Sequence, residues 1–108
     1  MAEDVCYLTT TGRRTGKPHG IEIWFGRDGD TLYLLSGGGD QADWVRNGLA
    51  HSEVTVRIGE TEHAARFRLV DDEREDALAR RLLLEKYFGG GTNEWGRTAL
   101  AVALDLQP

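Results

Sequence analysis

The sequence has little cysteine, few prolines and no long apolar run, and each shortage excludes a class of protein. With Cys6 as its single cysteine, the chain can form no internal disulfide and no cysteine cluster for zinc, which suits a reducing cytoplasm. No stretch approaches the roughly 20 apolar residues that a membrane span needs. The acidic start at Glu3 and Asp4 is unlike the basic start of a signal peptide. We therefore expect a cytoplasmic protein that is not inserted in a membrane.

Signatures of metal-dependent and hydrolytic catalysis are missing as well. The histidines, His19, His51 and His63, have no spacing typical of metal ligands, so we expect no metal. Ser36 precedes glycines but lacks the Gly-x-Ser-x-Gly elbow of many hydrolases. Cys6 falls in an apolar segment, where a free thiol usually serves packing rather than catalysis. These absences eliminate several mechanisms that depend on side chains or metals alone.

The charge of the chain is negative overall but unevenly distributed. The net charge of −5 argues against a general nucleic-acid binder, which usually needs a basic face. Between Val5 and Ile21 there is no acidic residue, whereas Arg13, Arg14 and Lys17 are all basic. A local cationic loop on an acidic body favours one compact anion over a long polyanion. We therefore expect a small anionic partner.

The length of 108 residues and the hydrophobic content of 40% allow one modest core, so we expect a single domain over residues 1–108. Alternating apolar residues and turn signals predict about six strands. These strands are expected over Val5–Thr11, Ile21–Phe25, Thr31–Ser36, Val54–Ile58, Thr61–Val70 and Thr98–Leu106. Asp28-Gly29 predicts a hairpin in which the second strand pairs with the third. Gly59-Glu60 predicts another hairpin, between the fourth strand and the fifth.

Two helices are expected between these strands. Asp40 and Asp43 can cap a short helix over Gln41–Leu49. Asp72 and Glu75 have capping-box spacing before a helix that runs to Tyr87, with Leu78, Leu82 and Leu83 as its buried stripe and the following glycines as its stop. Strands joined mainly by hairpins predict a mainly β (α+β) fold, a small antiparallel barrel with helices at its edge.

Two loops are candidates for binding an anion. The first, Gly12–Lys17, is not a phosphate-binding P-loop, because its glycines are too close together and Pro18 replaces the hydroxyl residue that holds magnesium. It still offers three cations, the Thr15 hydroxyl and glycines that allow close approach. The second, Ser36–Gly39, offers backbone N–H groups at the start of a helix. If both loops lie at the same end of the barrel, they can hold one ligand from two sides.

Several other side chains are candidates for lining a pocket. Tyr87 and Trp95 flank a glycine-rich segment and are candidates for a pocket rim, whereas Trp24 and Trp44 are expected to be mainly structural. Arg46 and Asn47 on the short helix either contact a ligand or brace the helix.

The chain resembles the deazaflavin (F420)-dependent nitroreductases, also described as quinone reductases, of the split β-barrel flavin-binding superfamily. The resemblance runs from about Val5 to Leu106 and is carried by four elements in order. These are the run from Tyr7 to Pro18, with its Thr-Thr-x-Gly-Arg-x-Thr-Gly pattern, then Ser36–Gly39, Trp44–Asn47 and Val54–Val56. The first element is quite specific when the others follow. The C-terminal third is far less so.

The resemblance implies a coenzyme with a planar deazaflavin ring and a tail of phosphate and glutamates, and it assigns residues to each part. By similarity, Arg13, Arg14, Thr15 and Lys17 would hold the tail. Ser36, Gly37 and Gly38 would lie near the phosphate or ring, and Trp44 would brace the pocket. Arg46, from its place on the short helix rather than from the resemblance, is a further candidate for binding the coenzyme. The region of Tyr87 would line the substrate side, and its hydroxyl is a candidate proton donor.

The expected activity is hydride transfer from reduced coenzyme F420 to a small electrophilic acceptor such as a quinone, an enone or a nitro compound. The coenzyme would supply the chemistry and the protein would supply binding, orientation and exclusion of water. Two alternatives remain open: the same barrel using FMN, and a protein that binds the coenzyme without catalysis. A homodimer is also expected, since barrels of this superfamily often pair through a sheet face.

Overall fold

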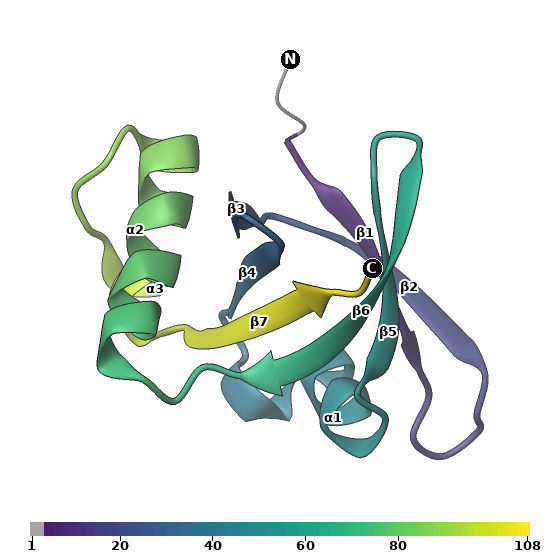
Figure 1. Ribbon diagram of the computed structural model, residues 1–108. Coiled ribbons are helices and arrows are strands. Elements are labelled where there is room, and N and C mark those ends of the chain that lie inside the picture. Colours follow the sequence, from purple (N-terminus) through teal and green to yellow (C-terminus); the bar gives the residue numbers. More distant parts are fainter. Residues whose placement is uncertain (1–3) are drawn as a thin grey trace.

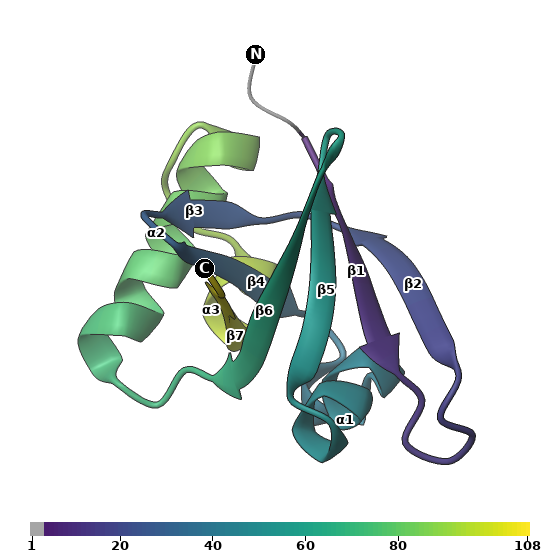
Figure 2. The same cartoon turned by 45° about the vertical axis from the view of Figure 1, so that its right-hand side comes forward.

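The computed structural model describes residues 4–108, which form one curled antiparallel sheet with helices at its margins (Figures 1 and 2). The seven strands of this region are β1 (Cys6–Thr11), β2 (Pro18–Ile23), β3 (Gly26–Asp28), β4 (Thr31–Ser36), β5 (Glu53–Ile58), β6 (Thr61–Leu69) and β7 (Leu100–Leu106). Its helices are the 3-10 turn η1 (Gly39–Gln41), α1 (Asp43–Ala50), α2 (Glu73–Phe88) and α3 (Glu94–Thr98).

The strand order is β2-β1-β5-β6-β7-β4-β3, and every neighbouring pair is antiparallel. The two edge strands, β2 and β3, are consecutive in the chain, and only Trp24 and Phe25 link them. The barrel is therefore split between β2 and β3. This architecture confirms the predicted split antiparallel barrel, with one strand and one α-helix more than the approximate numbers expected.

One predicted pairing is wrong. The segment Ile21–Phe25 does not pair with Thr31–Ser36: β2 pairs with β1, in a register that places Cys6 opposite Ile23, and the short β3 pairs with β4. The sequence alternation runs through the break without a visible interruption. Trp24 and Phe25 leave the ladder at this point, and Phe25 enters the core.

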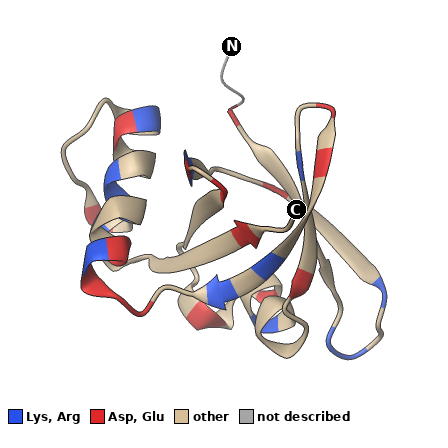
Figure 3. Cartoon of the chain, in the orientation of Figure 1, with Lys and Arg blue, Asp and Glu red and all other residues tan. Residues whose placement is uncertain are grey.

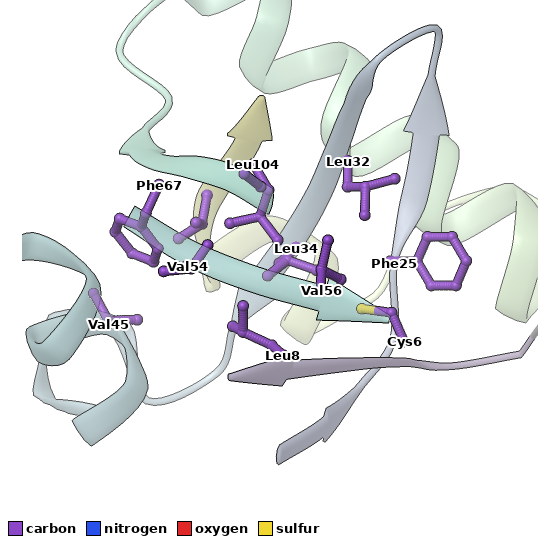
Figure 4. Packing of buried hydrophobic residues seen from close by; sticks show 12 residues of the cluster. Cys6, Leu8, Phe25, Leu32, Leu34, Val45, Val54, Val56, Phe67 and Leu104 are labelled. Atoms are coloured by element: carbon purple, nitrogen blue, oxygen red, sulfur yellow. The ribbon is translucent and has the colours of Figure 1, made fainter. Parts of the chain in front are cut away.

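The core explains why β4 is nearly all apolar. Its alternate residues face two different clusters, and both faces of the strand are buried. Leu32 and Leu34 belong to the cluster inside the barrel, with Leu8, Val56 and Leu104, and Figure 4 shows this group at close range. The opposite face of β4 packs against α2 in a second cluster, whose members include Tyr33, Leu35 and Leu83. The strand is thus buried on both sides, as its unbroken hydrophobic run requires.

The helix boundaries follow their capping residues. The Asp72 side chain accepts a hydrogen bond from the Glu75 N–H at 2.9 Å, and Gly89 ends α2 with φ +72°, which confirms both predicted signals. The predicted cap by Asp40 is wrong, because Asp40 lies within η1 and Ala42 precedes α1 without a side-chain cap. The helix α3 was not predicted, although Asn93 caps it by accepting a bond from Gly96 N–H at 2.7 Å.

A charged network joins α2 to the sheet. The Arg68 guanidinium donates to both Glu75 carboxylate oxygens at 2.7 Å, and its Nε donates to Asp105 at 2.7 Å. The Tyr33 hydroxyl also donates to Glu75, at 2.7 Å. These bonds hold the pKa of Glu75 at about 2, below its ordinary 4.5. Burial and the neighbouring Glu75 raise the pKa of Tyr33 to about 12.

Glu75→Gln is expected to lower the melting temperature at neutral pH and to reduce its dependence on acid. Because the pKa of Glu75 is lowered by folding, its contribution is present above pH 4.5 and is lost as the pH falls toward about 2. Thermal unfolding followed by circular dichroism from pH 2 to 7 measures this. Glu85→Gln is the control, because its carboxylate lies 3.8 Å from Arg81 at the surface of the same helix. An acid response of Glu75→Gln equal to that of the wild type would contradict the assignment.

Candidate active site

The loop between β1 and β2 folds against α1 and encloses an open cavity of about 250 Å³, hereafter the anion cavity. It is lined by Gly12, Arg13, Arg14, Thr15, His19, Asp43 and Asn47. Figure 3 shows the basic residues of this loop beside α1, at the lower right of the view. The predicted cationic loop therefore lines a cavity together with α1, rather than extending into solvent as an isolated turn.

Glycines give this loop its shape. Gly12 accepts a hydrogen bond from Gly16 N–H at 2.8 Å and donates its own N–H to the Lys17 carbonyl at 2.8 Å. Gly16 has φ +72°, which favours glycine. A Cβ on Gly12 would lie 2.7 Å from Nε2 of His19, so the exposed His19 ring would have to shift to admit a larger residue. The Thr15 hydroxyl accepts from Lys17 N–H at 3.2 Å and keeps its proton available for donation.

Asn47 anchors the loop to α1. The Asn47 side chain is buried, and its Oδ1 accepts from the Arg13 backbone N–H at 3.2 Å and from Arg13 Nη1 at 2.9 Å. Its Nδ2 donates to the buried Thr10 hydroxyl at 3.3 Å. Of the two roles left open for Asn47, the structure supports bracing. The same contacts fix Arg13 at the wall of the anion cavity.

Arg14 and Lys17 have a different environment from Arg13. Both are exposed, and within residues 4–108 neither side chain has a hydrogen bond or an ion pair. Arg14 lines the anion cavity and Lys17 follows in the same loop, so both charges are available to an anionic ligand. The loop therefore combines one oriented guanidinium with two adaptable charges.

The glycine turn that follows β4 lies next to α1. Ser36 is buried, and its hydroxyl donates to the Gly39 carbonyl at 2.9 Å, while Gly39 has φ +61°. A Cβ on Gly37 would lie 3.4 Å from Cδ1 of Trp95. Gly38 immediately precedes η1. The turn thus contacts Trp95 at one end and leads into α1 at the other, and Figures 1 and 2 show both candidate loops at the α1 end of the barrel.

A second, mainly apolar cavity of about 430 Å³ lies at the link between the edge strands, hereafter the aromatic cavity. It is lined by Val5, Glu22, Ile23, Trp24, Leu35, Phe88 and Trp95. Trp24 is 41% exposed and Phe88 is 48% exposed, which is unusual for such large apolar side chains. Trp24 stacks on Tyr87 with ring centroids 4.5 Å apart and meets Trp95 edge-on at 5.6 Å.

The aromatic cavity corrects the sequence reasoning in two places. Trp24 was expected to be mainly structural, yet it lines the cavity as well as packing on Tyr87. Phe88 was not singled out. A signal was present for Trp24, because it falls on the polar, outward-facing positions of the alternation that begins with Ile21. Trp95 lies at the rim as predicted.

Tyr87 braces the link between β2 and β3. Its hydroxyl accepts from Phe25 N–H at 2.9 Å and donates to the Asp4 carbonyl at 2.6 Å. Burial raises the pKa of this phenol, which opposes loss of its proton. The ring is under Trp24 and is not among the residues that line the aromatic cavity.

Trp44 and Arg46 also support the site from outside its cavities. Trp44 packs edge-on against Phe67 at 6.2 Å and is half-buried against the barrel core. Arg46 Nε donates to the Asp40 carbonyl at 3.2 Å and so ties η1 to α1. Neither residue lines the anion cavity or the aromatic cavity.

Two other features are absent from the described part of the chain. No group of three His, Cys, Asp or Glu side chains within residues 4–108 is arranged to hold a metal ion. No helix in this region is both long and apolar enough to cross a bilayer. The groups present instead suit a ligand with an aromatic ring and an acidic tail, because β2 contributes to both cavities, with His19 in the anion cavity and Glu22 and Ile23 in the aromatic cavity.

Comparisons with solved structures find several proteins of the same fold. Among solved structures, an F420-H2 dependent reductase (FDR-A) is 20% identical, with a TM-score of 0.74 over 94% of this chain and 93% of that one. A conserved hypothetical protein, Rv2991 from Mycobacterium tuberculosis, is 16% identical, with a TM-score of 0.77 over 96% and 73%. HutZ, the heme storage protein from Vibrio cholerae, is 13% identical, with a TM-score of 0.76 over 98% and 83%. At these identities the likeness establishes the fold.

The sequence comparisons decide the family. No curated protein matches the chain. The sequence model of the F420H(2)-dependent quinone reductases matches residues 1–104. This match favours F420 over FMN and a reductase over a non-catalytic carrier. The chain belongs to the F420H(2)-dependent quinone reductase family and is an oxidoreductase that uses coenzyme F420.

Proposed function

We propose that this reductase passes a hydride from reduced F420 to a small, uncharged, planar acceptor, with a quinone favoured over an enone or a nitro compound. The observation that carries the proposal is that β2 contributes residues to two unlike cavities. The aromatic cavity is lined by Trp24, Phe88 and Trp95, and the anion cavity presents Arg13 and Arg14. A coenzyme with a flat ring and an acidic tail has one part suited to each.

The acceptor class is inferred from the walls of the aromatic cavity. Glu22 is the one charged residue among those that line it, and the rest are apolar or aromatic. A carboxylate on the acceptor would be repelled by Glu22 and would lose its hydration without gaining a cation. A neutral quinone loses little on entry and gains contact with the aromatic rings. This supports neutral planar acceptors.

Each candidate residue has a role in this proposal. Arg13, Arg14 and Lys17 bind the acidic tail, with the Thr15 hydroxyl as a further donor. Gly37 and Gly38 let the backbone approach the coenzyme closely. Four residues act by positioning: Ser36 and Arg46 shape the turn before α1, Trp44 braces the helix on the core, and Tyr87 holds Trp24.

The chemistry is divided between coenzyme and protein. Reduced F420 supplies the hydride when it is bound, and the aromatic walls orient the acceptor beside it. The proton that accompanies the hydride comes from solvent, because the Tyr87 hydroxyl is already bonded to Asp4 and Phe25 and its pKa is raised. We therefore place Tyr87 as a positioning residue rather than as the proton donor considered from the sequence.

The function is tested by fluorescence titration of the purified protein with F420 and with FMN, followed by oxidation of reduced F420 with one acceptor of each class. We expect tighter binding of F420 than of FMN and the highest kcat/KM with a neutral quinone. Tight FMN binding without F420 binding would overturn the cofactor. F420 binding with a carboxylated quinone as the better acceptor would overturn the role of Glu22.

We also propose a homodimer. Trp24 and Phe88 are exposed where they line the aromatic cavity, and a second subunit would close this cavity over the bound ring. Light scattering after size-exclusion chromatography measures the mass. A monomer at micromolar concentration, in the presence and absence of F420, would contradict this.

A further inference from the structure

Asp43 is the one carboxylate among the residues that line the anion cavity. Its Oδ1 lies 3.2 Å from Arg13 Nη2, and the Asp43 side chain is 85% exposed whereas that of Arg13 is 24% exposed. An acid at this place is unexpected in a cavity that is otherwise cationic, because it repels the anion that the neighbouring cations attract.

Asp43 is not needed to hold Arg13 in position. Asn47 already accepts from the backbone N–H of Arg13 and from its Nη1, and Asn47 is buried. Asp43 contributes one contact, made by one oxygen of an exposed side chain. Exposed ion pairs of this kind are weak, so an incoming multivalent anion can displace Asp43 from Nη2.

We infer that Asp43 is an internal competitor that occupies Arg13 in the free protein and weakens the hold on the acidic tail of the coenzyme. The inference rests on the proposed placement of that tail in the anion cavity. When the tail binds, the Asp43 carboxylate yields Nη2 to it, and when the tail leaves, the carboxylate returns. Asp43 thus lowers affinity and speeds dissociation without a change in the shape of the site.

Faster dissociation suits a reductase that takes its hydride from a coenzyme. Each transfer leaves oxidised coenzyme, which must leave or be reduced again before the next cycle. A cavity lined by two guanidinium groups, with Lys17 in the same loop and no competing acid, would hold a multivalent anion strongly and delay its release. Asp43 reduces that delay while Arg14 and Lys17 remain free to attract the next molecule.

A purely structural role for Asp43 makes a different prediction. Asp43 lies in the first turn of α1, where a negative charge is favourable. If it serves only the helix, Asp43→Asn will lower stability slightly and leave affinity unchanged or weaker. If it competes for Arg13, the same variant will bind the tail more tightly. The two roles therefore give effects of different kinds that one variant separates.

The test compares wild type, Asp43→Asn and Asp43→Glu by F420 fluorescence titration and by stopped-flow dissociation. We expect Asp43→Asn to lower Kd and the dissociation rate about threefold to tenfold, the size of a weak ion pair with its local repulsion. Asp43→Glu keeps the negative charge, so its Kd and its dissociation rate should stay within about twofold of the wild-type values. Calorimetric titration with inorganic pyrophosphate, an anion that has no deazaflavin ring, should rank the affinities of the three proteins in the same order.

Glu53→Gln is the matched control, because Glu53 is an exposed carboxylate, 4.0 Å from Arg66, that does not line the anion cavity. An equal gain in affinity from Glu53→Gln would show that the effect comes from the net charge of the protein rather than from Asp43, and it would overturn the inference. An unchanged or weaker affinity of Asp43→Asn would also overturn it. Competition further requires that Asp43→Asn gain less in an Arg13→Ala background, and an undiminished gain would contradict it.

These outcomes are separate from the test of the proposed function. If wild-type protein fails to bind F420, the proposed placement of the coenzyme fails. If wild type binds F420 and Asp43→Asn binds it no more tightly, only the competitor role fails.

Discussion

Replacing Asn47 with alanine is expected to lower the free energy of unfolding by about 1–3 kcal/mol and to weaken F420 binding. The Asn47 side chain is buried and satisfies three polar groups: the backbone N–H and Nη1 of Arg13, and the hydroxyl of Thr10. Alanine leaves the buried Thr10 hydroxyl without this partner and releases Arg13 from the wall of the anion cavity. Stability and affinity should therefore fall together.

Urea denaturation and F420 titration of the same samples measure both effects. Asn47→Asp keeps an acceptor for Arg13, so it should lower the free energy of unfolding less than Asn47→Ala does. It also adds a negative charge beside the tail, so its loss of F420 affinity should be larger relative to its loss of stability. Ser52→Ala is the control, because it removes an exposed bond from Arg66 at 3.3 Å and should change neither quantity appreciably. An Asn47→Ala protein with wild-type stability and affinity would remove Asn47 from its anchoring role.

The importance of Asn47 shows where the sequence is informative and where it is not. A period of two, glycine turns and a capping box depend on neighbours in the chain, so they predicted most strands, the β5–β6 hairpin and the ends of α2. The pairing of β2 with β1 depends on where the chain leaves the sheet. Trp24 and Phe25 continue the alternation through that break, so no local pattern marks it.

The same distinction applies to the site. The cationic loop was visible because Arg13, Arg14 and Lys17 are close in sequence and no acid lies among them. Its closure by α1 was not, because the bonds from Arg13 to Asn47 and Asp43 join segments that are distant in the chain. The sequence of a short polar helix does not indicate which of its side chains points inward. Only the three-dimensional packing distinguishes Asn47, which anchors Arg13, from Asp43, which competes for it.

The aromatic cavity was only half predicted for a related reason. Trp95 and the glycines before it are a local signal, and Trp95 does line the cavity. Trp24 and Phe88 join it because the split of the barrel brings the β2–β3 link to the end of α2. Tryptophan is also a common core residue, so composition favoured the structural interpretation of Trp24.

Arg13→Ala and Arg14→Ala are each expected to weaken F420 binding by about 1–3 kcal/mol, a rise in Kd of roughly 5-fold to 150-fold. Arg14→Ala should leave folding nearly unchanged, because the Arg14 side chain has no hydrogen bond or ion pair within the described residues. Arg13→Ala should also lower stability, because it removes a hydrogen-bond partner from the buried Asn47 side chain.

Titration of both variants at low and high salt separates charge from geometry. Each lost phosphate or carboxylate contact should reduce the salt dependence of Kd, since fewer charges are then screened. Arg13→Lys restores the charge but not the planar fork that reaches Asn47 and the ligand together, so it should recover only part of the affinity. Arg27→Ala, at the distant β3–β4 hairpin, is the control and should bind as wild type does. Wild-type affinity in both Arg13→Ala and Arg14→Ala would mean that the acidic tail lies elsewhere on the protein.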